Sequence, residues 1–202
     1  FAQISAEAQA RTHVLFDGES LEGWTVVGGA GSGEVAVRDG AIVLGRGEPL
    51  TGIVWAGAFP RIDYEVTLQA MRVEGSDFFS AITFPVGEDY STLVIGGWGG
   101  GVVGLSSLEG SDASENETRR YLAVEDGRWY SVRLRVTQER VKVWIDGEQF
   151  VDLPHRDRLL SVRLEMLANR PFGIASWMTT GAIRDVEVQE LGRTTSDLRP
   201  LR

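Results

Sequence analysis

The sequence predicts an all-β fold in which two antiparallel sheets pack face to face as a β-sandwich of jelly-roll type. Three observations lead to this prediction. Apolar and polar residues alternate with a period of two over many short segments, Asp-Gly pairs separate several of these segments, and no long segment carries the apolar stripe of a helix. A chain of 202 residues is long enough for one such domain.

The strands follow from the alternation. In YEVTLQA, residues 64–70, Tyr64, Val66 and Leu68 share one face and polar residues share the other, as a strand buried on one side requires. The same pattern predicts strands at 132–136, 141–145, 160–166 and 184–188. The segment ISAEAQA, residues 4–10, is the one place where a helical turn or two is plausible.

Turns and chain ends set the predicted boundaries. Three pairs of residues that tolerate positive φ predict tight hairpins, at Asp39-Gly40, Asp126-Gly127 and Asp146-Gly147. We expect residues 1–13 to form a lead-in, residues 14–191 a single sandwich domain, and residues 192–202 a surface tail, because GRTTSDLRPLR lacks apolar alternation.

Composition excludes several classes of partner. The formal charge of −9 repels nucleic acid phosphates and anionic membrane surfaces, and no apolar stretch approaches the roughly 20 residues that span a bilayer. The absence of cysteine removes thiol chemistry and disulfides. The start, FAQISAEAQA, lacks an initiator methionine and contains AQA, which fits the end of a cleaved export signal. We therefore expect a secreted or periplasmic protein, although AQA also fits an ordinary polar lead-in.

Four stretches resemble one known family. They are VLFDGESLEGW at 14–24, VRDGAIVL at 37–44, GRWYSVRLRVTQERVKVWIDGEQFVDL at 127–153, read as a two-strand unit, and GIASWMTTGAIRDVEVQEL at 173–191. In this order and spacing they resemble the 3-keto-disaccharide hydrolase domain family. The resemblance implies a fold of the concanavalin A-like lectin and glucanase type and a carbohydrate-related role, usually in secreted or periplasmic bacterial proteins. It assigns no catalytic residue, so the candidate site below comes from chemistry.

Outward-facing tryptophans are candidates for contact with sugar, because the apolar C–H faces of a sugar ring stack on indole. If the apolar residues of 141–145 point inward, Trp144 points outward beside Lys142, and the same reasoning places Trp177 outward. Trp98 lies in GGWGGG, where glycines allow a ligand to approach the backbone closely. The alternatives are that Trp144 and Trp177 cover the edge of the core and that Trp98 plugs it from a glycine-rich bulge.

The polar stretch LEGSDASENETRR, residues 108–120, supplies the candidate catalytic groups. If residues 115–119 are extended, Glu115, Glu117 and Arg119 project from one face, with the two glutamates about 7 Å apart at Cα. Asp112 and Asn116 are the candidate groups for hydrogen bonds to sugar. The alternative is a solvated acidic loop whose residues close turns.

A 3-keto sugar suggests a specific reaction. The ketone at C3 acidifies the hydrogen at C2, so a base can remove it and expel the substituent at C1, and hydration completes net hydrolysis. In this hypothesis Glu117 or Glu115 is the base, Arg119 or a metal stabilises the enolate, and Trp98 stacks on the ring. The alternatives are a non-catalytic carbohydrate-binding module that uses Trp98, Trp144 and Trp177, and a structural interaction module.

No metal or other cofactor is predicted. His13 and His155 are the two histidines and lie far apart in the sequence, so a multi-histidine site within one chain is excluded. Calcium is the more plausible ion, because it binds carboxylates and carbonyls. Asp17 and Asp185 could meet if the first and last strands pair, although both also fit turns or solvent-facing positions.

Overall fold

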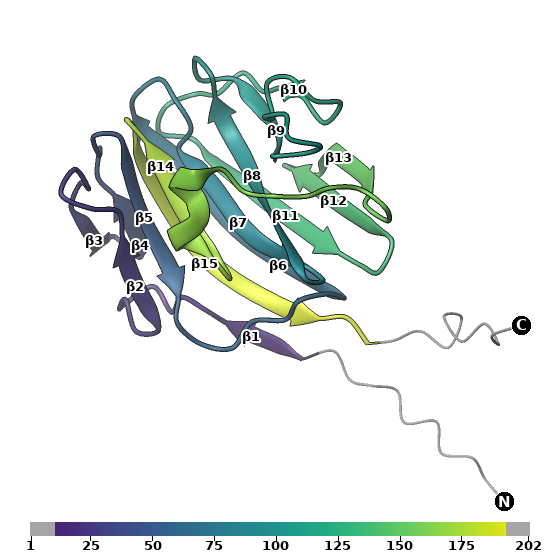
Figure 1. The fold of residues 1–202 in the computed structure, drawn as a ribbon. Helices are drawn as coiled ribbons and strands as arrows, with labels where there is room; N and C mark the ends of the chain where they lie inside the picture. The colour runs from purple at the N-terminus through teal and green to yellow at the C-terminus, as the bar shows by residue number, and fades with distance from the viewer. Residues whose placement is uncertain (1–10, 193–202) are drawn as a thin grey trace, which may run out of the picture.

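The computed structural model describes residues 11–192 and confirms the all-β fold, with two antiparallel sheets packed against each other (Figure 1). The predicted helical turn, the AQA at 8–10 and the tail beyond residue 192 lie outside the described residues. Within residues 11–192, no helix is long and apolar enough to cross a membrane.

Sheet A has eight strands and includes the first and last strands of the domain. Its order is β13 (Glu148–Pro154), β12 (Arg140–Ile145), β11 (Trp129–Val136), β6 (Tyr64–Glu74), β15 (Thr180–Glu190), β4 (Ala41–Leu44) and β3 (Val35–Arg38), and β1 (Thr12–Val14) also pairs with β15. The pairing of β1 with β15 brings the two ends of the domain together, as a jelly roll requires.

Sheet B has seven strands and forms the other layer. Its order is β10 (Arg120–Tyr121), β9 (Val102–Ser106), β8 (Asp89–Gly97), β7 (Ser80–Val86), β14 (Gly173–Trp177), β5 (Leu50–Trp55) and β2 (Trp24–Val27). A short 3₁₀ helix, η1 (Leu164–Asn169), lies over this sheet in front of β14 (Figure 1).

The core lies between the sheets and follows the predicted alternation. In β12 the residues Val141, Val143 and Ile145 are buried, whereas Lys142 and Trp144 face away from the core. Tyr64 is fully buried in β6, and its hydroxyl donates to the carbonyl of Pro85 at 2.6 Å. This bond satisfies a polar group that burial would otherwise leave without a partner.

Two sequence predictions about strands were wrong. Residues 160–166 do not form a strand: residues 160–163 are irregular apart from an isolated bridge at Leu160, and residues 164–166 belong to η1. The apolar residues of this segment do not share one buried face, because Leu160 and Met166 are buried whereas Leu164, between them, is 82% exposed. The predicted two-strand unit at 127–153 contains a third strand, β13.

Two of the three Asp-Gly turns have the backbone that their sequence predicts. The prediction of a hairpin at Asp126-Gly127 was wrong: Gly127 has a φ of 77°, but Asp126 does not have a positive φ, and the turn leads from β10 of sheet B to β11 of sheet A. Asp39 and Gly40 have φ of 50° and 74°, and Asp146 and Gly147 have φ of 50° and 82°. These values fit two-residue hairpin turns, which join β3 to β4 and β12 to β13.

A matched pair of leucines tests the position of the core. Leu134→Ala removes a fully buried side chain of β11 and is expected to lower the free energy of unfolding by about 2–5 kcal/mol. Leu159→Ala, at a side chain that is 61% exposed, is expected to change it by less than about 0.5 kcal/mol. Urea unfolding followed by tryptophan fluorescence measures both values, and equal losses would contradict the placement of Leu134.

Candidate functional site

The outer face of sheet B, turned away from the core, carries a row of small side chains. Across five neighbouring strands, cross-strand partners align in the order Gly104, Val94, Ala81, Ala175 and Gly52. Small side chains leave room for other segments to pack directly on the sheet. This row forms the floor of the candidate site.

Two segments rest on this floor and form its walls. On one side, Ala113 of the loop 108–120 packs with Val94 and Val102. On the other side, Met166 of η1 packs with Ala81 and Ala175. A Cβ at Gly104 would lie 3.2 Å from the Cβ of Ala113, so glycine lets the loop approach this closely.

A pocket opens between the two walls, over β7, β8 and β9. We call it the central pocket, and its lining includes Asp77, Val94, Trp98, Arg163, Glu165 and Trp177. Trp98 is 40% exposed and lies in the turn between β8 and β9, where its φ is 47°. Trp177 is half-buried, and its ring centroid lies 5.9 Å from that of Phe78. Two indoles therefore line one pocket and offer it flat apolar surfaces.

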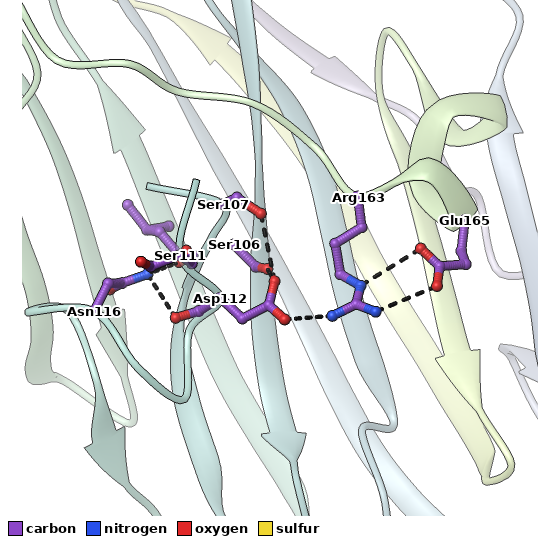
Figure 2. Close-up of polar contacts among 8 residues, drawn as sticks. Ser106, Ser107, Ser111, Asp112, Asn116, Arg163 and Glu165 are labelled. Carbon is purple, nitrogen blue, oxygen red and sulfur yellow. Dashed lines mark hydrogen bonds and ion pairs between the residues drawn. The ribbon is translucent and has the colours of Figure 1, made fainter. Parts of the chain in front are cut away.

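Arg163 joins the two walls (Figure 2). Its Nη1 donates to Oδ2 of Asp112, and its Nε and Nη2 donate to the carboxylate of Glu165 at 3.4 and 3.3 Å. The hydroxyls of Ser106 and Ser107 donate to Oδ1 of Asp112 at 3.1 and 3.4 Å. The guanidinium lowers the pKa of Glu165 through these hydrogen bonds, so Glu165 stays ionised at neutral pH.

Asp77 is the carboxyl of the pocket whose pKa is raised. Burial raises its pKa, against the lowering effect of hydrogen bonds from the backbone N–H groups of Phe78 and Trp98. The Phe78 N–H lies 2.8 Å from Oδ1, and the Asp77 N–H donates to Oγ1 of Thr179 at 3.1 Å. A carboxylate with a raised pKa in a pocket is a stronger base than an exposed one.

The loop 108–120 is held by Asn116, which the sequence analysis assigned to sugar binding. Its Nδ2 donates to the carbonyls of Leu105, Ser111 and Asp112 at 2.8, 3.1 and 2.9 Å. Its Oδ1 accepts from the N–H and the hydroxyl of Thr118 at 2.9 and 2.6 Å. The amide of Asn116 is therefore fully engaged: the bond to Leu105 attaches the loop to β9, and the other bonds lie within the loop.

The structure does not bring Glu115, Glu117 and Arg119 into the central pocket. Residues 113–118 form consecutive turns instead of the extended segment that would align these side chains. Glu117 pairs with Arg158 at 2.8 Å, and Nη1 of Arg119 donates to the carbonyl of Ser114 at 2.8 Å. Their catalytic role stays a prediction, and Asp112 is the residue of this loop that reaches the edge of the pocket, through Arg163.

Trp144 lies on the other sheet, away from the two tryptophans of the pocket. It faces outward from β12 as predicted, but on the outer face of sheet A. The guanidinium of Arg133 lies 3.9 Å from its ring centroid, a cation–π contact that covers this indole. The three tryptophans therefore do not share one groove.

The candidate metal ligands make other contacts. Oδ1 of Asp17 accepts from the backbone N–H groups of Glu19 and Ser20, which lowers its pKa, and Asp185 lies 3.6 Å from Arg184. His13 lies 3.6 Å from Glu190, and Nε2 of His155 lies 2.8 Å from the carbonyl of Thr137. Within the described residues, no group of three or more His, Cys, Asp or Glu is arranged to hold a metal ion.

Sequence reasoning missed Asp77, Arg163 and Glu165. Asp77 stands in EGSDFFS, in the connection between β6 and β7, where it directly precedes two aromatic residues, and this is its only local signal. Arg163 and Glu165 fell within a segment predicted to be a strand, so the alternation concealed their place beside the pocket.

With this geometry described, comparison with known proteins identifies the family. The sequence matches the 3-keto-alpha-glucoside-1,2-lyase-like domain over residues 11–189. The chain belongs to this family. The match confirms the resemblance seen in the four sequence stretches. No curated protein sequence matches the chain at a significant level.

Solved structures share the fold of this 3-keto-alpha-glucoside-1,2-lyase-like domain at low sequence identity. The apo Crh5 transglycosylase is 13% identical with a TM-score of 0.61, over 93% of this chain and 86% of that chain. A prokaryotic β-1,3-1,4-glucanase (lichenase) from a mouse hindgut metagenome is 11% identical with a TM-score of 0.57, over 90% and 98%. The carbohydrate binding module CBM66 from Bacillus subtilis is 16% identical with a TM-score of 0.52, over 82% and 94%. The fold is thus one found in both carbohydrate-active enzymes and carbohydrate-binding modules.

The raised pKa of Asp77 predicts a pH-dependent change in stability. Because the folded protein holds this proton more tightly than the unfolded chain does, the stability contributed by Asp77 falls as pH rises through the raised pKa. Asp77→Asn keeps an oxygen acceptor and removes the charge, so it is expected to raise the free energy of unfolding at neutral pH. The gain should vanish at acid pH, where Asp77 is protonated in both states.

Urea unfolding of the wild type and the variant at both pH values measures this difference, and Asp157→Asn at an exposed loop position is the control. Equal destabilisation by Asp77→Asn at both pH values would contradict the assigned environment.

Proposed function

We propose that the central pocket binds a 3-keto-glycoside and cleaves it by base-assisted elimination followed by hydration. One observation carries the proposal: Asp77, a carboxyl whose pKa is raised by burial, lines the same pocket as Trp98, Trp177 and Arg163. The description of the family, a 3-keto-alpha-glucoside-1,2-lyase-like domain, supports this choice of substrate class.

The reaction needs a base, a group that stabilises negative charge on oxygen, and a proton for the leaving group. In the proposed sequence the carboxylate of Asp77 takes the proton from C2, and the electron pair forms an enolate with the ketone at C3. The enolate then expels the C1 oxygen, which takes the proton held by Asp77, leaving a double bond between C1 and C2. Water adds to C1 and C2 regains a proton, so the net reaction is hydrolysis.

Arg163 is the group assigned to the developing enolate. It stays charged, and its ion pairs with Asp112 and Glu165 use three of the five N–H bonds of a guanidinium. The other two are available to a ketone oxygen. Glu165 is not assigned as the proton donor, because its pKa is lowered and it stays ionised.

A second function, carbohydrate binding without catalysis, is favoured by one feature of the pocket. Asp112 and Glu165 carry two negative charges against the single positive charge of Arg163. These carboxylates weaken the electrostatic attraction between Arg163 and an enolate. A lectin needs only the two indoles and polar groups such as Ser106. The structural likeness to a carbohydrate binding module fits this alternative.

A panel of oligosaccharides and their 3-keto derivatives separates the two functions. The purified domain is incubated with each compound, products are followed by mass spectrometry, and thermal shift is read in the same wells. Release of monosaccharides from the keto compounds alone is the expected result. A thermal shift without products would support the binding module and overturn the proposed reaction.

Paired variants then test the assignment of the base. Asp77→Asn is expected to lower kcat on a 3-keto disaccharide by about 10²–10⁴-fold while binding of the unoxidised disaccharide persists. The double variant Glu115→Gln/Glu117→Gln is expected to retain kcat, because these side chains lie outside the pocket. The reverse pattern would return the catalytic role to the loop 108–120.

A further inference from the structure

A second groove adjoins the central pocket on the same face of the molecule. We call it the side groove: Val27, Pro49, Leu50, Ala168 and Trp177 line it together with the loop 28–32. It shares Trp177 and Glu165 with the central pocket, so the two spaces adjoin at these side chains. The side groove is also larger, at about 540 Å³ against about 160 Å³.

The polar side chains of the side groove are mostly engaged already. The hydroxyl of Ser32 donates to the carbonyl of Leu50 at 3.3 Å, and the carboxylate of Glu165 pairs with Arg163. The remaining polar side-chain groups of the lining are the carboxylate of Glu48, which is exposed, and the indole N–H of Trp177. A second sugar ring would bring several hydroxyls into this space, and each needs a partner to replace water.

The wall formed by the loop 28–32 is built into the fold. The N–H of Glu48 donates to the carbonyl of Gly31 at 2.6 Å. A Cβ at Gly31 would lie 2.1 Å from the carbonyl oxygen of Glu48, and one at Gly28 would lie 1.8 Å from Oγ of Ser32. Only glycine permits these approaches, so the loop is fixed against residues 48–50 and the groove is present without a ligand.

We propose that the side groove is the subsite for the leaving group, and that it takes a flat apolar aglycone such as an aromatic ring rather than a second sugar. The proposal rests on the proposed function of the central pocket. A substituent on C1 of a ring held in the central pocket would extend into the side groove, which lies on the other side of Trp177. Val27, Pro49 and Leu50 line the groove there. An aromatic ring gains from leaving water there and requires no hydrogen bonds.

The experiment compares leaving groups on one sugar, and two of them, benzyl alcohol and methanol, have similar acidity. Steady-state kinetics are measured with benzyl and methyl 3-keto-α-glucosides and with 3-keto-maltose. We expect kcat/KM for the benzyl compound to exceed that for the methyl compound by about tenfold or more, mainly through KM, and to exceed that for the disaccharide. Equal values for benzyl and methyl, or a preference for the disaccharide, would overturn the proposal.

A pair of variants on η1 ties the preference to this groove. Ala168→Glu introduces a carboxylate into the lining and is expected to bring the benzyl-to-methyl ratio close to one. Leu164→Glu introduces the same charge at a side chain that is 82% exposed and is expected to keep the ratio of the wild type. A benzyl preference that survives Ala168→Glu would place the aglycone elsewhere.

Calorimetric titration with unoxidised benzyl α-glucoside, methyl α-glucoside and maltose separates the two proposals. Tighter binding of the benzyl compound, lost in Ala168→Glu, supports the side groove even if no keto compound is turned over, in which case the proposed reaction alone fails. Equal binding of benzyl and methyl glucosides, or tighter binding of maltose, overturns the side groove even if turnover occurs.

Discussion

The central pocket depends on the contact between two segments that lie on the outer face of sheet B. Arg163 joins Asp112, from the loop that follows β9, to Glu165, from η1, and these segments are about fifty residues apart in the sequence. Each segment also packs on the small side chains of sheet B, but through a separate apolar cluster. The backbone of Ser107 also exchanges two hydrogen bonds with that of Ser161, at 2.8 and 3.1 Å, so the same two segments are joined beside the ion pair of Arg163 and Asp112. Together these contacts hold the two walls around the space above Val94 and Ala81.

The two outer faces of the sandwich differ in a way that follows from their residues. On sheet A, the guanidinium groups of Arg133 and Arg184 lie over Trp144 and Trp129, at 3.9 and 4.2 Å from the ring centroids, so these indoles are covered by the protein itself. On sheet B, small residues on the strands leave room for two walls and a pocket. Trp144 lines a hollow on sheet A together with Arg133, whereas on sheet B two indoles, Trp98 and Trp177, line one pocket.

The sequence was sufficient for most of the fold because alternation and Asp-Gly turns are local signals. The strand prediction failed at 160–166. Apolar residues alternate there because some of them pack on the outer face of sheet B, and the segment is not itself a strand of a sheet. The sequence identified Trp98 and Trp177 as candidates for contact with a ligand, because a glycine-rich context and the alternation along a strand are also local signals. The sequence did not place Asp77 and Arg163 beside these indoles, because only the fold brings their segments together. It also gave no sign that Asn116 holds the loop 108–120 through hydrogen bonds to backbone carbonyls.

The most direct test of the account is a crystal structure of the Asp77→Asn variant bound to a 3-keto disaccharide, which the variant should bind without rapid turnover. The account predicts the keto ring in the central pocket, with C2 facing residue 77, the ketone oxygen at Arg163, and Trp98 and Trp177 beside the rings. A sugar bound against Trp144 on sheet A, or against Glu115 and Glu117 at the loop, would contradict it.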